Sequence, residues 1–203
     1  MNVPSLFNPV LSDNMERSSN FQREDNTLYD LVLFTTDEGW TERINNKTRI
    51  WKSMADAYSK AYSFKAIMFT HTPELINRFS NSSVKVITNF EVTRIGVPTV
   101  TGLYYSAYQT FNALYYGYVN ADILLNYTVF DALKYLQSQV KEQKLHPQHE
   151  LAGRVYEKSY SEIPFAFESV DHVQQFFRSV VVTRSTLRNA GSAVSAVSVR
   201  CKV

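Results

Sequence analysis

The sequence of 203 residues is poor in glycine and cysteine, and each shortage excludes a class of site. Its six glycines include no pair with the G-x-G spacing of a dinucleotide-binding loop and no Gly-Lys pair of a Walker A loop. The single cysteine, Cys201, cannot form a disulfide within the chain or build a cysteine-based zinc site. The sequence therefore points away from the common phosphate-binding loops and from disulfide-stabilised or zinc-centred folds.

Long apolar runs are also missing. No run approaches the roughly 18–20 apolar residues that a membrane-spanning helix needs. Residues 1–20 lack the basic start and apolar centre of a signal peptide. Taken by itself, the sequence predicts a soluble cytoplasmic protein with no membrane span.

Acidic residues are absent after Asp171, and this makes the charge uneven. Residues 178–203 contribute +5 to an overall formal charge of +2, which leaves −3 for the rest of the chain. A mildly acidic body gives no electrostatic reason to bind nucleic acid, so we expect no nucleic-acid partner.

What the chain does contain is enough apolar sequence, 44%, to bury a core. Short apolar runs rich in strand formers alternate with segments that repeat apolar residues every three or four positions. We expect strands at 31–36, 65–70, 84–88, 116–119 and 151–156, and helices at 41–60, from Thr72, at about 99–114 and at 126–144. This alternation predicts an α/β fold, with three α/β/α layers and a mostly parallel sheet.

The composition divides the chain into three parts. Residues 1–27 are polar and predict a mobile N-terminal arm, and residues 28–156 hold the α/β core. Residues 157–203 form an atypical C-terminal segment, in which Val and Ser supply 12 of the 25 positions from 179 to 203. Three interpretations remain open for this segment: a mobile basic tail, an added strand, or sequence foreign to the fold.

In an open α/β sheet, ligands bind beyond the carboxyl ends of the strands. The residues that follow the expected strands are polar and rich in oxygen: Thr35, Thr36, Asp37, His71, Thr88, Asn89, Asn120 and Asp122. Such a group suits Mg²⁺ or Mn²⁺, with phosphates as the remaining ligands. Asp122 lies amid apolar sequence, so it is either a metal ligand or the cap of the next helix.

The tyrosine-rich stretch from Tyr104 to Tyr118 is not interleaved with basic residues, because residues 95–133 contain no Lys or Arg. Stacking on nucleic-acid bases normally combines aromatic and basic side chains. We therefore expect these tyrosines to pack in the core and between helix and sheet.

Four short elements resemble one family. Residues 118–124, Tyr-Val-Asn-Ala-Asp-Ile-Leu, look like the diphosphate–metal motif of nucleotide-diphospho-sugar transferase-like proteins with a GT-A fold. Gly96-Val97-Pro98 is similar to the G-x-P element of that family, Phe34-Thr35-Thr36 to its first strand, and Gly153-Arg154 to its G-R-R element. The resemblance covers residues 28–156.

The resemblance implies a glycosyltransferase of the hexosyltransferase type, which uses a nucleotide-diphosphate sugar and a divalent metal. Asp122 would coordinate Mn²⁺ or Mg²⁺ at the donor's diphosphate, and Asn120 would hold the first position of a D-x-D-like motif. Thr35 and Thr36 would lie near the base or ribose, and Arg154 would face a phosphate or the acceptor. The acceptor would be a hydroxyl of a glycan or protein, and the family points to the secretory pathway or Golgi.

The chain also departs from the family. Asn120 is an amide where a carboxylate is expected, Val155 replaces the second Arg of G-R-R, and no acceptor region or catalytic base is recognisable after residue 156. The alternative is therefore a non-catalytic or truncated relative that keeps the nucleotide-sugar-binding fold. A sugar nucleotidyltransferase would need a glycine-rich basic loop after the first strand, where this chain has Asp37-Glu38.

Overall fold

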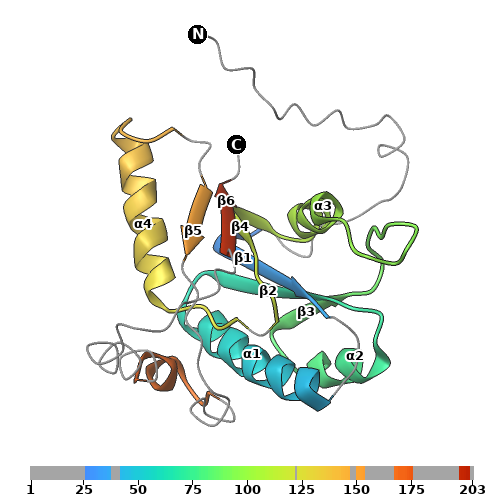
Figure 1. The fold of residues 1–203 in the computed structure, drawn as a ribbon. Helices are drawn as coiled ribbons and strands as arrows, with labels where there is room; N and C mark the ends of the chain where they lie inside the picture. Colours follow the sequence, from blue (N-terminus) through green and yellow to red (C-terminus); the bar gives the residue numbers. More distant parts are fainter. Residues whose placement is uncertain are drawn as a thin grey trace, which may run out of the picture.

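A computed structural model describes residues 26–37, 42–121, 123–146, 150–153, 167–175 and 197–201. Strands and helices alternate along most of this chain (Figure 1). In order, the elements are β1 (Leu28–Thr36), α1 (Glu42–Ala61), β2 (Phe64–Phe69), α2 (Pro73–Phe79), β3 (Val84–Ile87), α3 (Val100–Thr110), β4 (Asn112–Tyr118), α4 (Thr128–Lys141), β5 (Glu150–Gly153) and β6 (Val197–Cys201).

The strands form one sheet in the order β3-β2-β1-β4-β6-β5. The first four are mutually parallel, whereas β6 runs antiparallel to β4 on one side and to β5 on the other. Five of the six strands therefore point the same way. This confirms the expected α/β class and the mostly parallel sheet.

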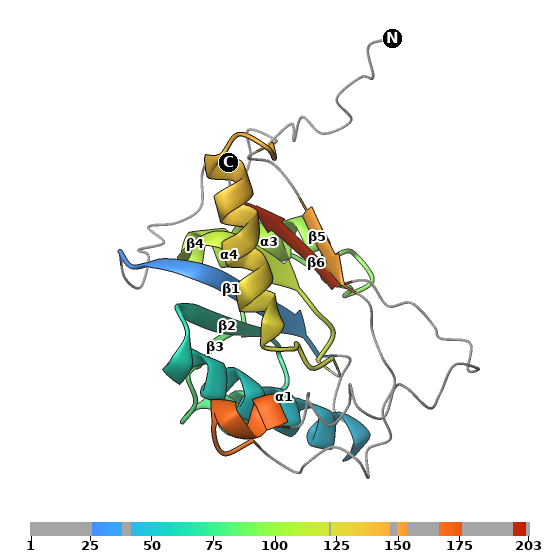
Figure 2. The same ribbon diagram turned by 90° about the vertical axis from the view of Figure 1, so that its left-hand side faces the viewer.

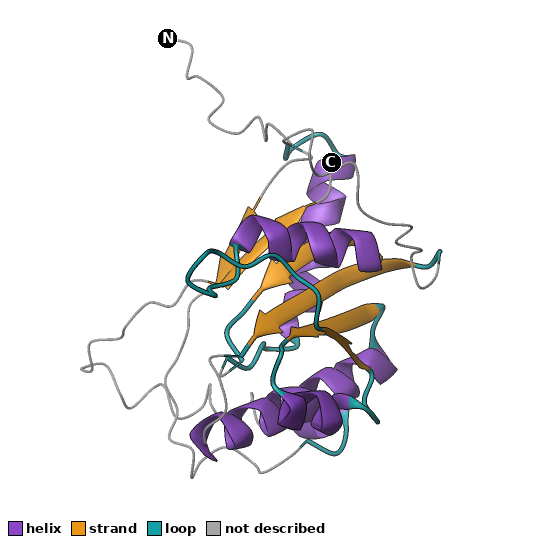
Figure 3. Ribbon diagram, turned by 90° about the vertical axis from the view of Figure 1, so that its right-hand side faces the viewer, coloured by secondary structure: helices purple, strands orange, loops and turns teal. Residues whose placement is uncertain are grey.

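Helices cover both faces of the sheet. Apolar residues of α1, α2 and α4 pack in one core cluster, which also holds Leu31 and Leu33 of β1. Residues of α3 pack in a second cluster with Val32 and Phe34 from the alternate positions of β1. Because successive side chains of a strand point to opposite faces, α3 and the other three helices lie on opposite sides of the sheet, as Figure 3 shows for α1 and α3.

The helix α1 forms the centre of the larger core. Trp51, Met54, Ala55 and Tyr58 recur at three- or four-residue spacing and are fully buried, which gives the helix one continuous apolar face. Its outer side carries an ion pair between Lys52 Nζ and Asp56 Oδ2 at 2.8 Å. The helix α4 lies beside β5 in Figure 1, crosses in front of the sheet in Figure 2, and inserts Phe130 beside Tyr58.

The boundary between α3 and β4 differs from the sequence-based prediction. The helix was expected to continue to Leu114, but it ends at Thr110 and β4 begins at Asn112. Tyrosine spacing continues the helical period past this point, yet pairing of Leu28 with Asn112 and of Tyr29 with Ala113 draws the segment into the sheet. Long-range strand pairing thus outweighs the local pattern.

Residues 197–201, in the atypical C-terminal segment, form the strand β6 and lie between β4 and β5. The sheet therefore takes one strand from outside the 28–156 core. Within the described part of the chain, no helix is long and apolar enough to cross a membrane.

Candidate functional site

The carboxyl ends of β1 and β4 are neighbours in the sheet. From β1 the chain moves outward through β2 and β3, and then returns to place β4 on the other side of β1. The order of the strands therefore reverses between β1 and β4, and such a switch point is where ligands bind in open α/β sheets. The hydrogen bond from Val119 N–H to the carbonyl of Phe34, at 3.1 Å, continues the contact beyond the end of β4.

Three uncharged polar side chains meet at this point. Tyr118 Oη lies 3.4 Å from Thr36 Oγ1 and donates to Asn120 Oδ1 at 3.2 Å. Since the tyrosine proton goes to Asn120, the Thr36 hydroxyl is left to donate to Tyr118. These three side chains can form hydrogen bonds with the hydroxyls of a ribose or another sugar. Because all three are uncharged, they offer a cation neutral oxygen ligands only.

Asp37 lies at the end of β1, and its carboxylate organises the neighbouring loop after β2. Asp37 Oδ2 accepts hydrogen bonds from Thr70 Oγ1 at 2.8 Å and from Thr72 Oγ1 at 2.5 Å. Thr72 therefore turns its hydroxyl toward Asp37 and makes no side-chain cap at the start of α2. Among the described residues, this carboxylate brings a negative charge to the carboxyl edge of the sheet, next to the end of β1.

The other strand-end residues are exposed. Thr88 and Asn89 follow β3 and face solvent. His71 follows β2, and its ring stacks on Phe90 with the centroids 4.5 Å apart and the planes 15° from parallel. The G-x-P element, Gly96 to Pro98, lies farther along the loop between β3 and α3.

Thr35 differs from Thr36 in its surroundings. Its side chain is fully buried, and its hydroxyl donates to the carbonyl of Thr36 at 3.4 Å. Thr36 is only half-buried. Of the two threonines that the resemblance assigns to the nucleotide, Thr36 is the one whose hydroxyl reaches the group at the switch point.

The segment after the site is tied to α1. Leu125 N–H lies 3.2 Å from Met54 Sδ, and its carbonyl accepts a 2.6 Å hydrogen bond from Tyr58 Oη. Burial is the largest cause that raises the pKa of the Tyr58 hydroxyl above its ordinary value, and the neighbouring Tyr62 and Tyr127 raise it further. The hydroxyl therefore stays protonated and remains a hydrogen-bond donor. On the other side, the carbonyl of Asn120 accepts from Ile123 N–H at 2.9 Å. Both flanks of position 122 are therefore fixed by hydrogen bonds.

Two residues that the sequence assigns to the site, Asp122 and Arg154, lie outside the described residues. Within the described ranges, no three His, Cys, Asp or Glu side chains are grouped so that they could hold a metal ion. A cation at the switch point would thus need ligands beyond these groups, and the resemblance offers Asp122 for that role beside the neutral oxygens of Thr36, Tyr118 and Asn120.

Sequence reasoning found the strand ends but missed Tyr118, Thr70 and Thr72. Tyr118 was assigned to packing along with the other tyrosines, although it stands two positions before Asn120 at the end of a strand. In a strand, residues two apart point to the same side. That spacing was the available signal that Tyr118 and Asn120 would meet.

Comparison of the chain with protein-family models, with curated proteins and with solved structures finds no match in any of the three.

Proposed function

We propose that this protein is a GT-A-like glycosyltransferase that binds a nucleotide-diphosphate sugar and a divalent metal, Mn²⁺ or Mg²⁺, at the carboxyl ends of β1 and β4. The observation that carries the proposal is the meeting of Thr36, Tyr118 and Asn120 at the switch point of the sheet. All three residues belong to stretches that resemble the nucleotide-sugar motifs, and β1 and β4 bring those stretches together.

The neutral hydrogen-bonding group suits the sugar-like part of a donor. Thr36, Tyr118 and Asn120 can orient a ribose or hexose through its hydroxyls without repelling the adjacent diphosphate. A divalent cation held by Asp122 would supply charge neutralisation for the leaving diphosphate. An acceptor hydroxyl of a glycan or protein would attack the anomeric carbon, and an inverting reaction would require a base near that hydroxyl.

The test is a thermal-shift series on the full chain with nucleoside diphosphates and their sugars, with and without Mn²⁺. A ligand at 100 times its Kd adds about 2.7 kcal/mol to the free energy of unfolding, which is a readily measured shift. We expect a shift that requires Mn²⁺ and is lost in Asp122→Asn. The matched control is Asp131→Asn, which removes the same charge from an exposed position in the first turn of α4.

A second substitution tests the role of Asn120. Asn120→Asp adds a carboxylate beside the Tyr118 hydroxyl, and more ligand charge strengthens cation binding. We expect the Mn²⁺ concentration needed for the nucleotide shift to fall. A shift that occurs without metal, or that survives in Asp122→Asn, would contradict the proposal.

The second candidate is a non-catalytic relative that keeps the binding fold. It is favoured by the amide of Asn120, which reduces the charge available to a metal, and by the burial of Thr35. This candidate predicts nucleotide binding without turnover. Donor hydrolysis or transfer that is lost in Asp122→Asn would exclude it.

A further inference from the structure

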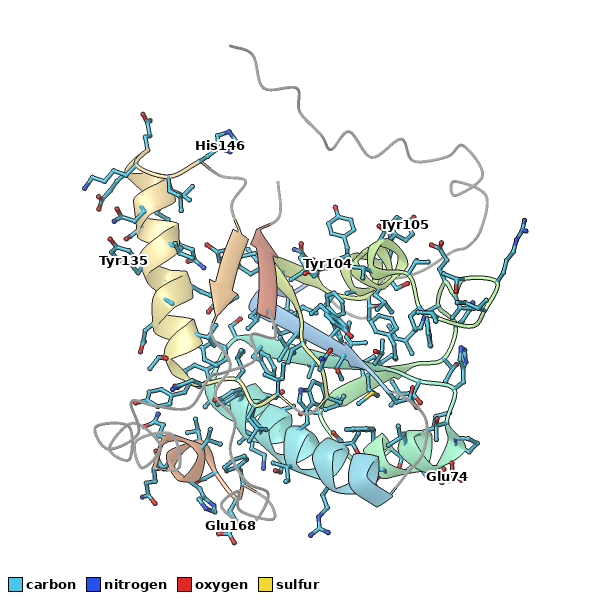
Figure 4. The ribbon with its side chains drawn as sticks, viewed as in Figure 1. Glu74, Tyr104, Tyr105, Tyr135, His146 and Glu168 are labelled. Carbon is cyan, nitrogen blue, oxygen red and sulfur yellow. The ribbon has the colours of Figure 1, made fainter. Side chains whose placement is uncertain are left out.

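A cluster of exposed apolar side chains lies on α3 and on the loop that leads into it. We call this the α3 surface, defined as Val92, Ile95, Val97, Val100 and Tyr105. Among the described residues, five of the eight large hydrophobic side chains with high exposure belong to it. Figure 4 shows Tyr105 on the side of α3 away from the sheet, whereas Tyr104 contacts Phe34 of β1.

The loop part of this surface is a tight hairpin. Val92 pairs with Pro98 as an antiparallel bridge, and the Thr93 N–H donates to the Val97 carbonyl at 2.7 Å. Gly96 takes a φ of +79°, which a glycine adopts without strain, and closes the turn. The turn presents Ile95 with 85% of its surface exposed, so an apolar side chain projects from an internally hydrogen-bonded support.

The helix α3 also lacks the charged outer face of the other helices. Its sequence, VTGLYYSAYQT, contains no charged residue, whereas α1, α2 and α4 all carry them. A surface helix normally turns charged or polar residues toward solvent. The buried residues of α3 are Gly102, Leu103, Ala107 and Thr110, and of these Leu103 and Ala107 pack in the cluster with β1, while Val100 is 54% exposed. The outer side of α3 therefore has the composition of a contact face.

The charges around this surface are self-complementary. Between Lys85 and Asp122 the chain has only two charged residues, Glu91 and Arg94. Both are exposed, and Arg94 lies in the hairpin, whereas Glu91 directly precedes it and lies beside Gly102 in the first turn of α3. In a two-fold symmetric interface, a residue pair on one copy meets the same pair in reverse on the other. Arg94 of each copy can thus face Glu91 of the other.

We propose that the α3 surface is the interface of a homodimer with two-fold symmetry. Depletion of charge at the centre, apolar and tyrosine side chains, and opposite charges at the edge are the features of such an interface. A membrane surface fits less well, because the hairpin offers one basic residue and the chain outside residues 178–203 has a net charge of −3.

Sedimentation equilibrium of the full chain tests the dimer with matched tyrosine substitutions. Tyr105→Lys places a charge at the centre of the proposed interface, and Tyr135→Lys makes the same change on the exposed side of α4. We expect Tyr105→Lys to weaken the dimer roughly tenfold or more and Tyr135→Lys to leave it unchanged. Both positions are exposed, so melting temperatures close to that of the unsubstituted chain will verify folding.

A charge exchange tests the geometry. Arg94→Glu gives each copy two acidic residues at the edge, and Glu91→Arg gives each copy two basic ones. Each variant alone should dimerise more weakly, whereas an equimolar mixture of the two should form a heterodimer. This recovery depends on the pairing of Arg94 with Glu91 and would not follow from a general loss of stability.

Three results would overturn the proposal. The first is an unsubstituted chain that stays monomeric at every concentration tested. The second is a dimer that survives Tyr105→Lys, since its interface would lie elsewhere. The third is flotation of the chain with phosphatidylcholine–phosphatidylserine vesicles that is lost in Tyr105→Lys, because the surface would then serve membrane contact.

Discussion

The two faces of the sheet are built differently. The face under α1, α2 and α4 holds the larger apolar core, with Trp51, Tyr58 and Phe130 among its buried aromatic residues. The face under α3 holds a smaller cluster around Phe34 and Leu103. The helices of the first face turn charged side chains outward, whereas α3 has none.

This difference indicates that the two faces of the sheet have different roles. On the α1 face, hydrogen bonds such as that from Tyr58 to Leu125 fix the segment next to the proposed donor site. On the α3 face, α3 and the hairpin before it carry apolar residues that are exposed in the described part of a single chain. We infer that the α1 face stabilises the fold and the segment after the proposed donor site, while the α3 face carries Tyr118 of that site and the proposed partner surface.

The largest expected effect compares the two cores directly. Phe130 packs on the rings of Tyr58, Phe64 and Tyr62, with a stacked distance of 3.9 Å to the last. Phe130→Ala should lower the free energy of unfolding by about 3–5 kcal/mol, and Leu103→Ala on the α3 face by about 2–4 kcal/mol. Urea denaturation measures both. A larger loss in Leu103→Ala would reverse the proposed ranking of the two cores.

A smaller effect is expected at the junction of α3 with its hairpin. A Cβ added to Gly102 would lie 2.7 Å from Glu91 Cβ and 2.7 Å from Thr99 Oγ1, which caps the helix. Gly102→Ala should therefore cost about 1–3 kcal/mol through overpacking, although alanine favours a helix. Thermal melts of the variant provide the measurement. An unchanged or raised melting temperature would show that Glu91 does not press on α3.

The smallest effect concerns the charged outer side of the α1 face. Asp56 accepts from Lys52, and its second oxygen accepts from Ser82 and from Ser83 N–H and Oγ. Burial raises the pKa of Asp56, but the hydrogen bonds from Lys52 and Ser83 outweigh it and hold the pKa below its ordinary value. A depressed pKa adds stability that is present at neutral pH and is lost as the pH falls below about 4, through the folded-state pKa.

Asp56→Asn should remove this part of the pH dependence. We expect the variant to be less stable than the unsubstituted chain at pH 7 and to approach it in acid, as measured by urea denaturation at several pH values. A stability difference that is the same at every pH would mean that the Asp56 carboxylate is not the group that titrates.

Much of the fold could be predicted from the sequence because its signals are local. The apolar runs around Val32, Ile67 and Val86 mark parallel strands, and the periodicity from Trp51 to Tyr58 marks α1. The end of α3 and the place of β6 in the sheet could not be predicted, because pairing with distant strands decides both. For β6, the Val and Ser residues near Val199 do not indicate that the strand pairs with β4 and β5.

For the site, the sequence predicts only that it lies at the carboxyl ends of the strands. The rule for parallel sheets selects Thr36, Asp37 and Asn120 without any motif. It does not show that Thr35 is buried or that Tyr118 joins Thr36 to Asn120, because these depend on how β1 and β4 align. The assignments of Asp122 and Arg154 remain predictions from the resemblance.

The most direct test of the proposed donor site is an NMR measurement of where Mn²⁺ binds in the presence of nucleoside diphosphates. Paramagnetic broadening should be strongest for the amides at the carboxyl ends of β1 and β4, including Asp37 and Asn120. The amides of Phe64 and Asn112, at the amino ends of β2 and β4, should stay sharp and serve as the internal control. Broadening at the amino ends, or none at the carboxyl ends with any nucleotide, would contradict the account.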